Sequence, residues 1–482
     1  LIAYRTDGTQ RRDLTPDFDR QLRAEHGLAW DLSPDGSKLV AACLRPGPER
    51  LEDSSLVVID LASAKHKHLG LAERINHLEA RFSPDGSQVA ATRHLREPMK
   101  YGRISLVLYG CEDGAQKALA DEWDCIPTLF DWTSKEQLLV TIPEAGHVPL
   151  YRVCTTTGDR TRISSEVAGG THSDIVCAGD KAIGLRHTFE SPPEVFSVDL
   201  QENATPTLCS SLSGLPFQVS LHMESLRCVG DGDTPVQYFF LSSDSVAVRR
   251  PTILWIHGGP VSAWGDGWHW RWNPLPLLAA GYNIALANPR GSTGFGQEFI
   301  DGVSGNQWGA ACYRDLMAIT DQLIQRDDVD PSKLIAMGGS FGGYMSNWIG
   351  TQTDRFAAIV THASLYRFSA FHGTTDYPAY WAHSMGLYPS DDPESYDRYS
   401  PHGFVDQWKT PVLITHGEKD YRVPISEALM LFEDLHRRQV DAKLLIFPDE
   451  NHWILKPRNA ERWYRECLLF LEAHAVPLCG HE

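Results

Sequence analysis

The sequence predicts two domains of different fold class: a repetitive all-β domain, followed by an α/β domain built on a mostly parallel, doubly wound sheet. The chain has 482 residues, which exceeds one ordinary domain. A Ser-Pro-Asp-Gly-Ser turn at residues 33–37 recurs at 83–87, 50 residues later. From about residue 220 strands alternate with amphipathic helices, which is typical of a parallel sheet.

The repeat predicts a β-propeller over residues 1–214. Pro presets φ in the turn and Gly accepts φ > 0, so the turn joins two strands. Related segments follow at 132–140 and, more loosely, at 174–200. Self-similarity at about 40–50 residues with several strands per copy favours propeller blades over a β-sandwich or a coincidence of turn motifs. We expect about four blades plus a fragment. Because this is few for a closed ring and the chain begins at Leu1, we expect an N-terminally shortened form.

The repeat units contain short apolar segments that we interpret as strands. They are residues 39–42, 56–61, 89–92, 105–109, 138–141 and 150–153. The polar stretch 210–218 contains Gly and Pro and ends the repeat, which places the domain boundary between residues 214 and 215.

Residues 215–482 form the predicted α/β domain. Its strands are expected at 236–241, 252–257, 283–287, 333–337, 357–361, 411–415 and 443–447. Several are continuous apolar runs, as in strands covered on both faces. Helical stripes lie between them, and we interpret these stripes as core packing: Leu316, Ile319 and Leu323 in one helix, Trp463, Cys467 and Leu471 in another.

Composition narrows the possible partners. The formal net charge of −18 argues against a nucleic-acid or anionic-membrane partner. The ten cysteines are scattered without a C-x-x-C pair, as in a cytoplasmic protein. His66 and His68 form an H-x-H pair, but no third ligand stands beside them, so we interpret the pair as a solvated turn and predict no metal or cofactor. A homo-oligomer is possible.

A Gly-x-Ser-x-Gly motif at residues 338–342 carries the strongest chemical signal. It follows the apolar strand 333–337 and opens a helix-like run. In that context the motif predicts a sharp strand-to-helix turn that exposes the Ser340 hydroxyl. The flanking glycines are needed because a Cβ would crowd the turn. An ordinary glycine loop is the alternative.

A serine nucleophile requires a histidine base oriented by a carboxylate, in the chain order Ser, Asp or Glu, His. Asp420 follows the strand 411–415, and His452 follows the strand 443–447. We therefore predict Ser340, Asp420 and His452 as a catalytic triad. Glu418 and Asp449 are the rival acids, and we expect His416, at a strand end, to be structural.

Acyl transfer also needs donors aimed at the developing oxyanion. The backbone N–H of Phe341, directly after the serine, is the first expected donor, and the loop 257–260 (His-Gly-Gly-Pro) is the expected source of a second. An aromatic-rich segment, 363–388, would suit either a hydrophobic substrate pocket or the core of a helical cap.

Four segments together resemble the prolyl oligopeptidase family of serine peptidases, within it the acylaminoacyl-peptidase-like branch. They are residues 257–260, 288–296, 338–344 and 416–424. The resemblance implies an α/β-hydrolase domain behind a propeller that admits only short peptides. It also implies the triad named above, oxyanion donors at Gly259 and Phe341, and substrate binding by Arg422. His257 departs from the tyrosine that prolyl-cleaving members carry, which favours a backbone donor.

The expected function is therefore hydrolysis of short peptides through an acyl-enzyme, as an acylaminoacyl-peptidase or oligopeptidase. A carboxylesterase would use the same machinery. A dipeptidyl-peptidase would need paired glutamates that hold a free amino terminus, and no such pair is evident in the sequence. The alternative from another class is a non-catalytic binding scaffold.

Overall fold

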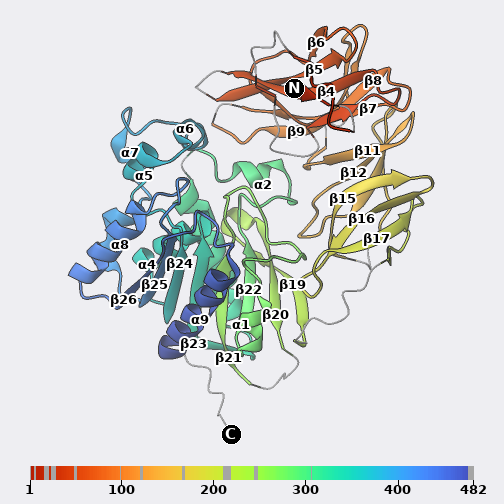
Figure 1. The fold of residues 1–482 in the computed structure, drawn as a ribbon. Helices are drawn as coiled ribbons and strands as arrows, with labels where there is room; N and C mark the ends of the chain where they lie inside the picture. The colour runs from red at the N-terminus through yellow and green to blue at the C-terminus, as the bar shows by residue number, and fades with distance from the viewer. Residues whose placement is uncertain are drawn as a thin grey trace. The chain divides into compact units, whose positions relative to one another are not determined.

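The computed structural model describes residues 2–4, 7–15, 21–22, 29–47, 51–97, 99–119, 123–165, 169–209, 219–243, 248–305 and 307–475. They form two compact units (Figure 1). The first comprises Leu1–His187 and Pro193–Ser211, and the second comprises Thr188–Pro192 and Leu212–Glu482. The predicted boundary between residues 214 and 215 lies outside the described residues.

The first unit contains four antiparallel four-stranded sheets and a two-stranded sheet. The first strands of successive sheets contact one another: β3 with β7, β7 with β11, and β11 with β15. This arrangement confirms the predicted β-propeller. The strands are β1(Ile2–Ala3), β2(Arg12–Asp13), β3(Trp30–Leu32), β4(Lys38–Pro46), β5(Glu52–Asp60), β6(His66–Leu69), β7(Ile75–Phe82), β8(Gln88–Leu95), β9(Arg103–Gly110), β10(Gln116–Ala118), β11(Thr128–Ser134), β12(Gln137–Thr141), β13(Leu150–Cys154), β14(Arg160–Arg162), β15(Thr171–Ala178), β16(Lys181–His187), β17(Glu194–Asp199) and β18(Thr207–Leu208).

The repeated turn has a local cause. Asp35 Oδ1 accepts hydrogen bonds from the Ser33 hydroxyl at 2.7 Å and from the Ser37 N–H at 3.0 Å. Asp85 makes the same two contacts one blade later. Such side-chain-to-backbone bonds stabilise the turn between the first two strands of these two blades.

The interpretation of residues 65–68 as a solvated turn was wrong. His66 and His68 lie in β6, the fourth strand of its sheet, which pairs with β5. The outer strands β6, β10 and β18 are short and mostly exposed, so they lack the apolar pattern from which strands are predicted. No group of three or more potential metal ligands occurs among the described residues.

The second unit is built on an eight-stranded sheet with the order β19-β20-β22-β21-β23-β24-β25-β26. β20 is antiparallel to both β19 and β22, and the pairs from β22 to β26 are parallel. Every strand predicted for this half is present. The bounds are β19(His222–Val229), β20(Pro235–Ser242), β21(Arg250–Ile256), β22(Asn283–Asn288), β23(Val329–Gly339), β24(Ala358–His362), β25(Val412–Gly417) and β26(Ala442–Phe447).

Helices lie between these strands and after the last one (Figure 1). They are η3(Asp231–Asp233), α1(Leu275–Ala279), α2(Gln297–Asp301), η4(Trp308–Cys312), α3(Tyr313–Leu323), α4(Phe341–Gln352), α5(Phe368–Thr374), α6(Pro378–Met385), α7(Pro393–Asp397), η5(Pro401–Gln407), α8(Ser426–Arg437) and α9(Pro457–His474). One apolar cluster joins α1 and α9 to the sheet. The predicted stripes on α3 and α9 are buried, which confirms that they are core. In the described part of the chain, no helix is long and apolar enough to span a bilayer.

The parallel strands determine where the site forms. β21, β23, β25 and β26 run in the same direction, so their carboxyl ends meet at one sheet edge. Ligand and catalytic groups of open α/β sheets gather at this edge. The loops after these four strands carry the glycine-rich segment 257–260, Ser340, Asp420 and His452.

Candidate active site

Ser340 occupies the sharp turn between β23 and α4. Its backbone has φ 57° and ψ −121°, a conformation that a residue with a side chain adopts only under constraint. A hydrogen bond from the Ser340 N–H to the His362 carbonyl, at 2.9 Å, holds the turn against β24. The geometry is that of a nucleophile elbow.

The neighbouring glycines are required by close packing. A Cβ at Gly338 would lie 2.4 Å from backbone atoms of Gly342. A Cβ at Gly342 would lie 2.1 Å from the Ile256 carbonyl oxygen, which no L-side chain could tolerate without a backbone shift. The predicted need for glycine on both sides of the serine is confirmed.

Asp420 and His452 are joined by a short hydrogen bond. His452 Nδ1 donates to Asp420 Oδ2 at 2.7 Å, which leaves Nε2 as the basic nitrogen of a neutral imidazole. The other carboxylate oxygen of Asp420 accepts the N–H groups of Arg422 and Val423, at 3.0 and 2.9 Å. The acid is therefore fixed in orientation and can hold His452 in one tautomer.

The charge of Asp420 is maintained despite burial. Burial alone would raise the pKa of this carboxyl, but the adjacent His416 and His452 side chains outweigh burial and hold the pKa well below its usual value. His416 is fully buried, and its Nε2 donates to the Val423 carbonyl at 2.7 Å. His416 thus has the structural place that the sequence predicts.

Neither rival acid contacts His452. Glu418 is exposed. Asp449 is exposed as well and binds Lys456 and, at 3.0 Å, the Asn459 side-chain amide. Of the three acids weighed in the sequence, only Asp420 reaches the imidazole.

The loop 257–260 packs against the elbow. A Cβ at Gly258 would lie 3.3 Å from the Gly339 carbonyl oxygen and 3.5 Å from Ser340 Cβ. Among the described residues, no hydrogen-bond partner is found for the N–H of Gly259 or of Phe341. These two N–H groups are therefore available donors beside the serine.

The His257 side chain is engaged in other hydrogen bonds and does not serve as an oxyanion donor. Its Nε2 lies 2.8 Å from the Ser292 hydroxyl, and its Nδ1 lies 2.6 Å from the Gly258 carbonyl oxygen. Burial lowers the pKa of His257 to about 4, so the ring is neutral at pH 7.

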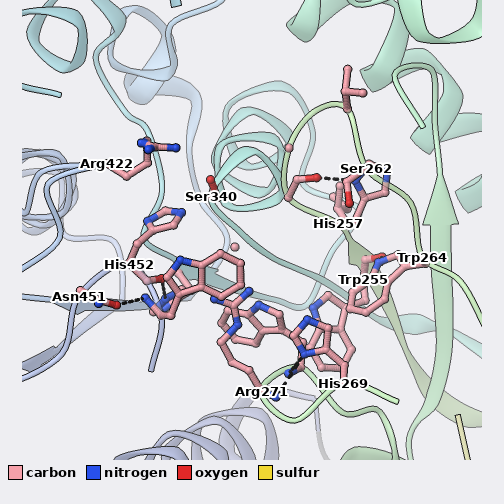
Figure 2. Close-up of a pocket in the computed structure, with 18 of the residues that line it drawn as sticks. Trp255, His257, Ser262, Trp264, His269, Arg271, Ser340, Arg422, Asn451 and His452 are labelled. Carbon is pink, nitrogen blue, oxygen red and sulfur yellow. Dashed lines mark hydrogen bonds between the residues drawn. The ribbon is translucent and has the colours of Figure 1, made fainter. Parts of the chain in front are cut away.

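A cavity of about 600 Å³ opens over these groups. Figure 2 shows Ser340 and the His452 imidazole next to each other, with Arg422 above them. The Arg422 guanidinium binds the Asp376 carboxylate at 2.7 Å. The described lining residues are Trp255, Ile256, His257, Gly258, Gly259, Val261, Ser262, Ala263, Trp264, His269, Arg271, Trp272, Gly339, Ser340, His362, Asp376, Trp381, Lys419, Tyr421, Arg422, Asn451, His452 and Trp453.

The aromatic segment 363–388 was expected to form either a hydrophobic substrate pocket or the core of a helical cap, and its residues divide between core and cavity. Tyr366, Phe368 and Phe371 are buried core residues. Trp381, from α6, lines the cavity. The segment therefore contributes three aromatic residues to the core and one to the cavity wall, and Tyr377 and Tyr388 are exposed.

Several lining residues were missed by the sequence interpretation. Asp376, Arg271 and Trp453 reach the cavity from separate loops, and only their folded positions bring them to the serine. The run Trp-His-Trp-Arg-Trp at 268–272, shortly after the glycine-rich loop, is the sequence signal that could have drawn attention to this wall.

The chain is similar in sequence to known peptidases. The model of the prolyl oligopeptidase family matches residues 268–476. Dipeptidyl-peptidase 5 of Schizosaccharomyces pombe is 30% identical over 495 residues, covering 98% of this chain and 71% of the relative. Dipeptidyl-peptidase 5 of Arthroderma otae is 30% identical over 478 residues, and this chain spans 63% of its length.

Solved structures show the same fold. Pyrococcus horikoshii acylaminoacyl peptidase has a TM-score of 0.79 and 20% identity, covering 97% of this chain and 73% of that one. A Mycobacterium tuberculosis puromycin-hydrolyzing peptidase has a TM-score of 0.75 and 19% identity. The match covers 98% of this chain and 82% of that one. The chain belongs to the prolyl oligopeptidase family of serine peptidases, with the predicted propeller and α/β-hydrolase domains.

Proposed function

We propose that this protein hydrolyses short peptides through an acyl-enzyme formed on Ser340. The observation that supports the proposal most strongly is the 2.7 Å hydrogen bond between Asp420 and His452, in a cavity that Ser340 shares. A serine on an elbow, a neutral imidazole and a buried carboxylate together make an otherwise weak hydroxyl nucleophilic.

In the proposed reaction His452 Nε2 removes the hydroxyl proton while Ser340 Oγ attacks the scissile carbonyl. The carbonyl oxygen becomes an oxyanion and accepts hydrogen bonds from the N–H groups of Gly259 and Phe341. The imidazolium then gives its proton to the leaving amine, and the C–N bond breaks. Water then attacks the acyl-enzyme ester on Ser340 by the same steps, with His452 again as the base. Asp420 stays ionised throughout.

Arg422 is the proposed binding group for the substrate main chain on the acyl side. The resemblance to the family assigns this role to the arginine two residues after the triad acid. Its guanidinium lines the cavity, and its ion pair with Asp376 is partly exposed, so a peptide carbonyl can approach the remaining N–H groups.

Two observations point to different forms of the substrate's amino terminus. The curated relatives are named dipeptidyl-peptidase 5, which favours release of a dipeptide from a free amino terminus. Among the described residues that line the cavity, Asp376 is the only acid, and it is paired with Arg422. That environment suits an acylated amino terminus better than a free ammonium group and favours acylaminoacyl-peptidase activity.

Three substrates test the proposal: an acetyl-amino-acid anilide, a free-amine dipeptide anilide and a p-nitrophenyl ester. We expect turnover of at least one anilide and loss of that turnover in Ser340→Ala. The preferred anilide shows whether the enzyme accepts an acylated or a free amino terminus. Hydrolysis of the ester alone would indicate a carboxylesterase, and hydrolysis of none would indicate a binding scaffold; either result would contradict the proposal.

A further inference from the structure

Arg271 is a cation of the cavity wall that the proposed reaction does not use. It precedes α1, on the segment that follows the glycine-rich loop, and its guanidinium carbon lies 3.6 Å from the ring centroid of Trp453 and 4.6 Å from that of Trp272. Stacking on aromatic faces fixes a planar guanidinium and leaves the N–H groups at its edge as donors.

These donors have no acid to bind among the residues that the structure describes. Among the described residues, no carboxylate lies within ion-pair distance of Arg271, and its Nε is buried without a hydrogen-bond partner. Burial lowers the pKa of Arg271 to about 9, which still leaves the side chain charged at pH 7. A desolvated cation without a counter-charge costs stability, and an anion bound there would offset that cost.

The described lining of the cavity carries a net positive charge, like Arg271 itself. The described lining contains Arg271, Lys419 and Arg422 as bases and Asp376 as the one acid, which is paired with Arg422. The chain as a whole carries a formal net charge of −18. A basic cavity in an acidic protein attracts an anionic ligand group and concentrates it at the site.

The position of Arg271 indicates which part of a substrate it meets. Arg422 and Arg271 both line the cavity, and in Figure 2 Arg422 lies above and Arg271 well below the two catalytic side chains. Ser340 and His452 lie between them in the same view. In the proposed reaction Arg422 holds the acyl side and His452 gives a proton to the leaving amine. Arg271 stacks on Trp453, the residue after His452, so it lies on the leaving-group side.

We propose that Arg271 binds a carboxylate of the leaving peptide. The inference rests on the proposed function, because it takes the leaving-group side from the proposed reaction. The carboxylate has two possible sources: the free carboxyl terminus of a short peptide, or an Asp or Glu side chain directly after the scissile bond. A guanidinium edge can bind either with two parallel hydrogen bonds.

The test uses three peptides that share the acyl part X-Ala and differ in the residue that leaves: X-Ala-Ala acid, X-Ala-Ala amide and X-Ala-Asp amide. X stands for the amino-terminal form that the enzyme accepts. We expect wild type to prefer a carboxylate-bearing peptide over the neutral amide. In Arg271→Gln this preference, as a ratio of kcat/KM values, should fall by about 10- to 100-fold, the usual value of a charge-assisted hydrogen bond. Arg355→Gln is the matched control, since Arg355 binds Asp321 and does not line the cavity.

The order of the kcat/KM values of the three peptides shows which source supplies the carboxylate. Preference for the acid identifies the carboxyl terminus, and preference for the Asp amide identifies the side chain. An equal loss on all three peptides in Arg271→Gln would mean that Arg271 only supports the His452 loop, and would overturn the inference. So would an unchanged preference.

Binding to the Ser340→Ala protein, measured by calorimetry, separates this inference from the proposed function. We expect the preferred carboxylate peptide to bind about 10-fold or more tightly than the neutral amide, and Arg271→Gln in the same background to remove the difference. Equal affinities would overturn the carboxylate site even if the wild type hydrolyses peptides. Absence of hydrolysis by wild type, with the affinity difference intact, would overturn only the proposed function.

Discussion

Replacement of His452 by alanine is expected to lower kcat by about 10⁶-fold, as removal of the base does in triad peptidases. The hydroxyl of Ser340 then has no group to take its proton, and the leaving amine has no donor. The measurement is steady-state turnover of the anilide that wild type prefers, with circular dichroism to show that the variant is folded.

Asp449→Ala is the matched control for this variant. Asp449 lies on the same loop, three residues before His452, but its partners are Lys456 and Asn459. We expect most of the turnover to remain. Loss of turnover in Asp449→Ala with activity retained in His452→Ala would show that the wrong loop residue was assigned as the base.

Replacement of Asp420 by asparagine is expected to lower kcat by about 10⁴-fold. The amide is nearly isosteric and keeps the packing, but its NH₂ group can donate to His452 Nδ1 and so favour the wrong tautomer. Asp420 accepts the 2.7 Å bond from that nitrogen, and its pKa is held well below the usual value, so wild type keeps the acceptor form.

Glu418→Gln provides the comparison for Asp420→Asn. Glu418 lies two residues earlier on the same loop and is exposed, so its neutralisation should leave most of the turnover. A loss of less than about tenfold in Asp420→Asn, or a larger loss in Glu418→Gln, would mean that Asp420 does not orient the base.

The strands and the elbow could be predicted because their signals are local. Apolar runs covered on both faces mark β21 to β25, and the glycines at 338 and 342 follow from contacts within a few ångströms of the turn. β19 was missed because it is an edge strand with every residue at least partly exposed. The error at residues 65–68 has the same cause, since lysine and histidine on an outer strand resemble a solvated turn.

The proposed triad could be inferred from position because parallel strands bring their carboxyl ends to one edge. The pairing of Arg422 with Asp376 and the stacking of Arg271 on Trp453 could not. Each joins side chains from loops far apart in the chain, and no spacing or periodicity in the sequence encodes which loops meet.

A fluorophosphonate probe tests the central claim most directly, because it phosphonylates only a serine that a neighbouring base has activated. The measurement is peptide mapping by mass spectrometry after labelling of the folded protein. We predict one adduct, on Ser340, that is absent in Ser340→Ala. A folded wild-type protein that stays unlabelled, or a label that persists in Ser340→Ala, would contradict the assignment of Ser340 as the nucleophile.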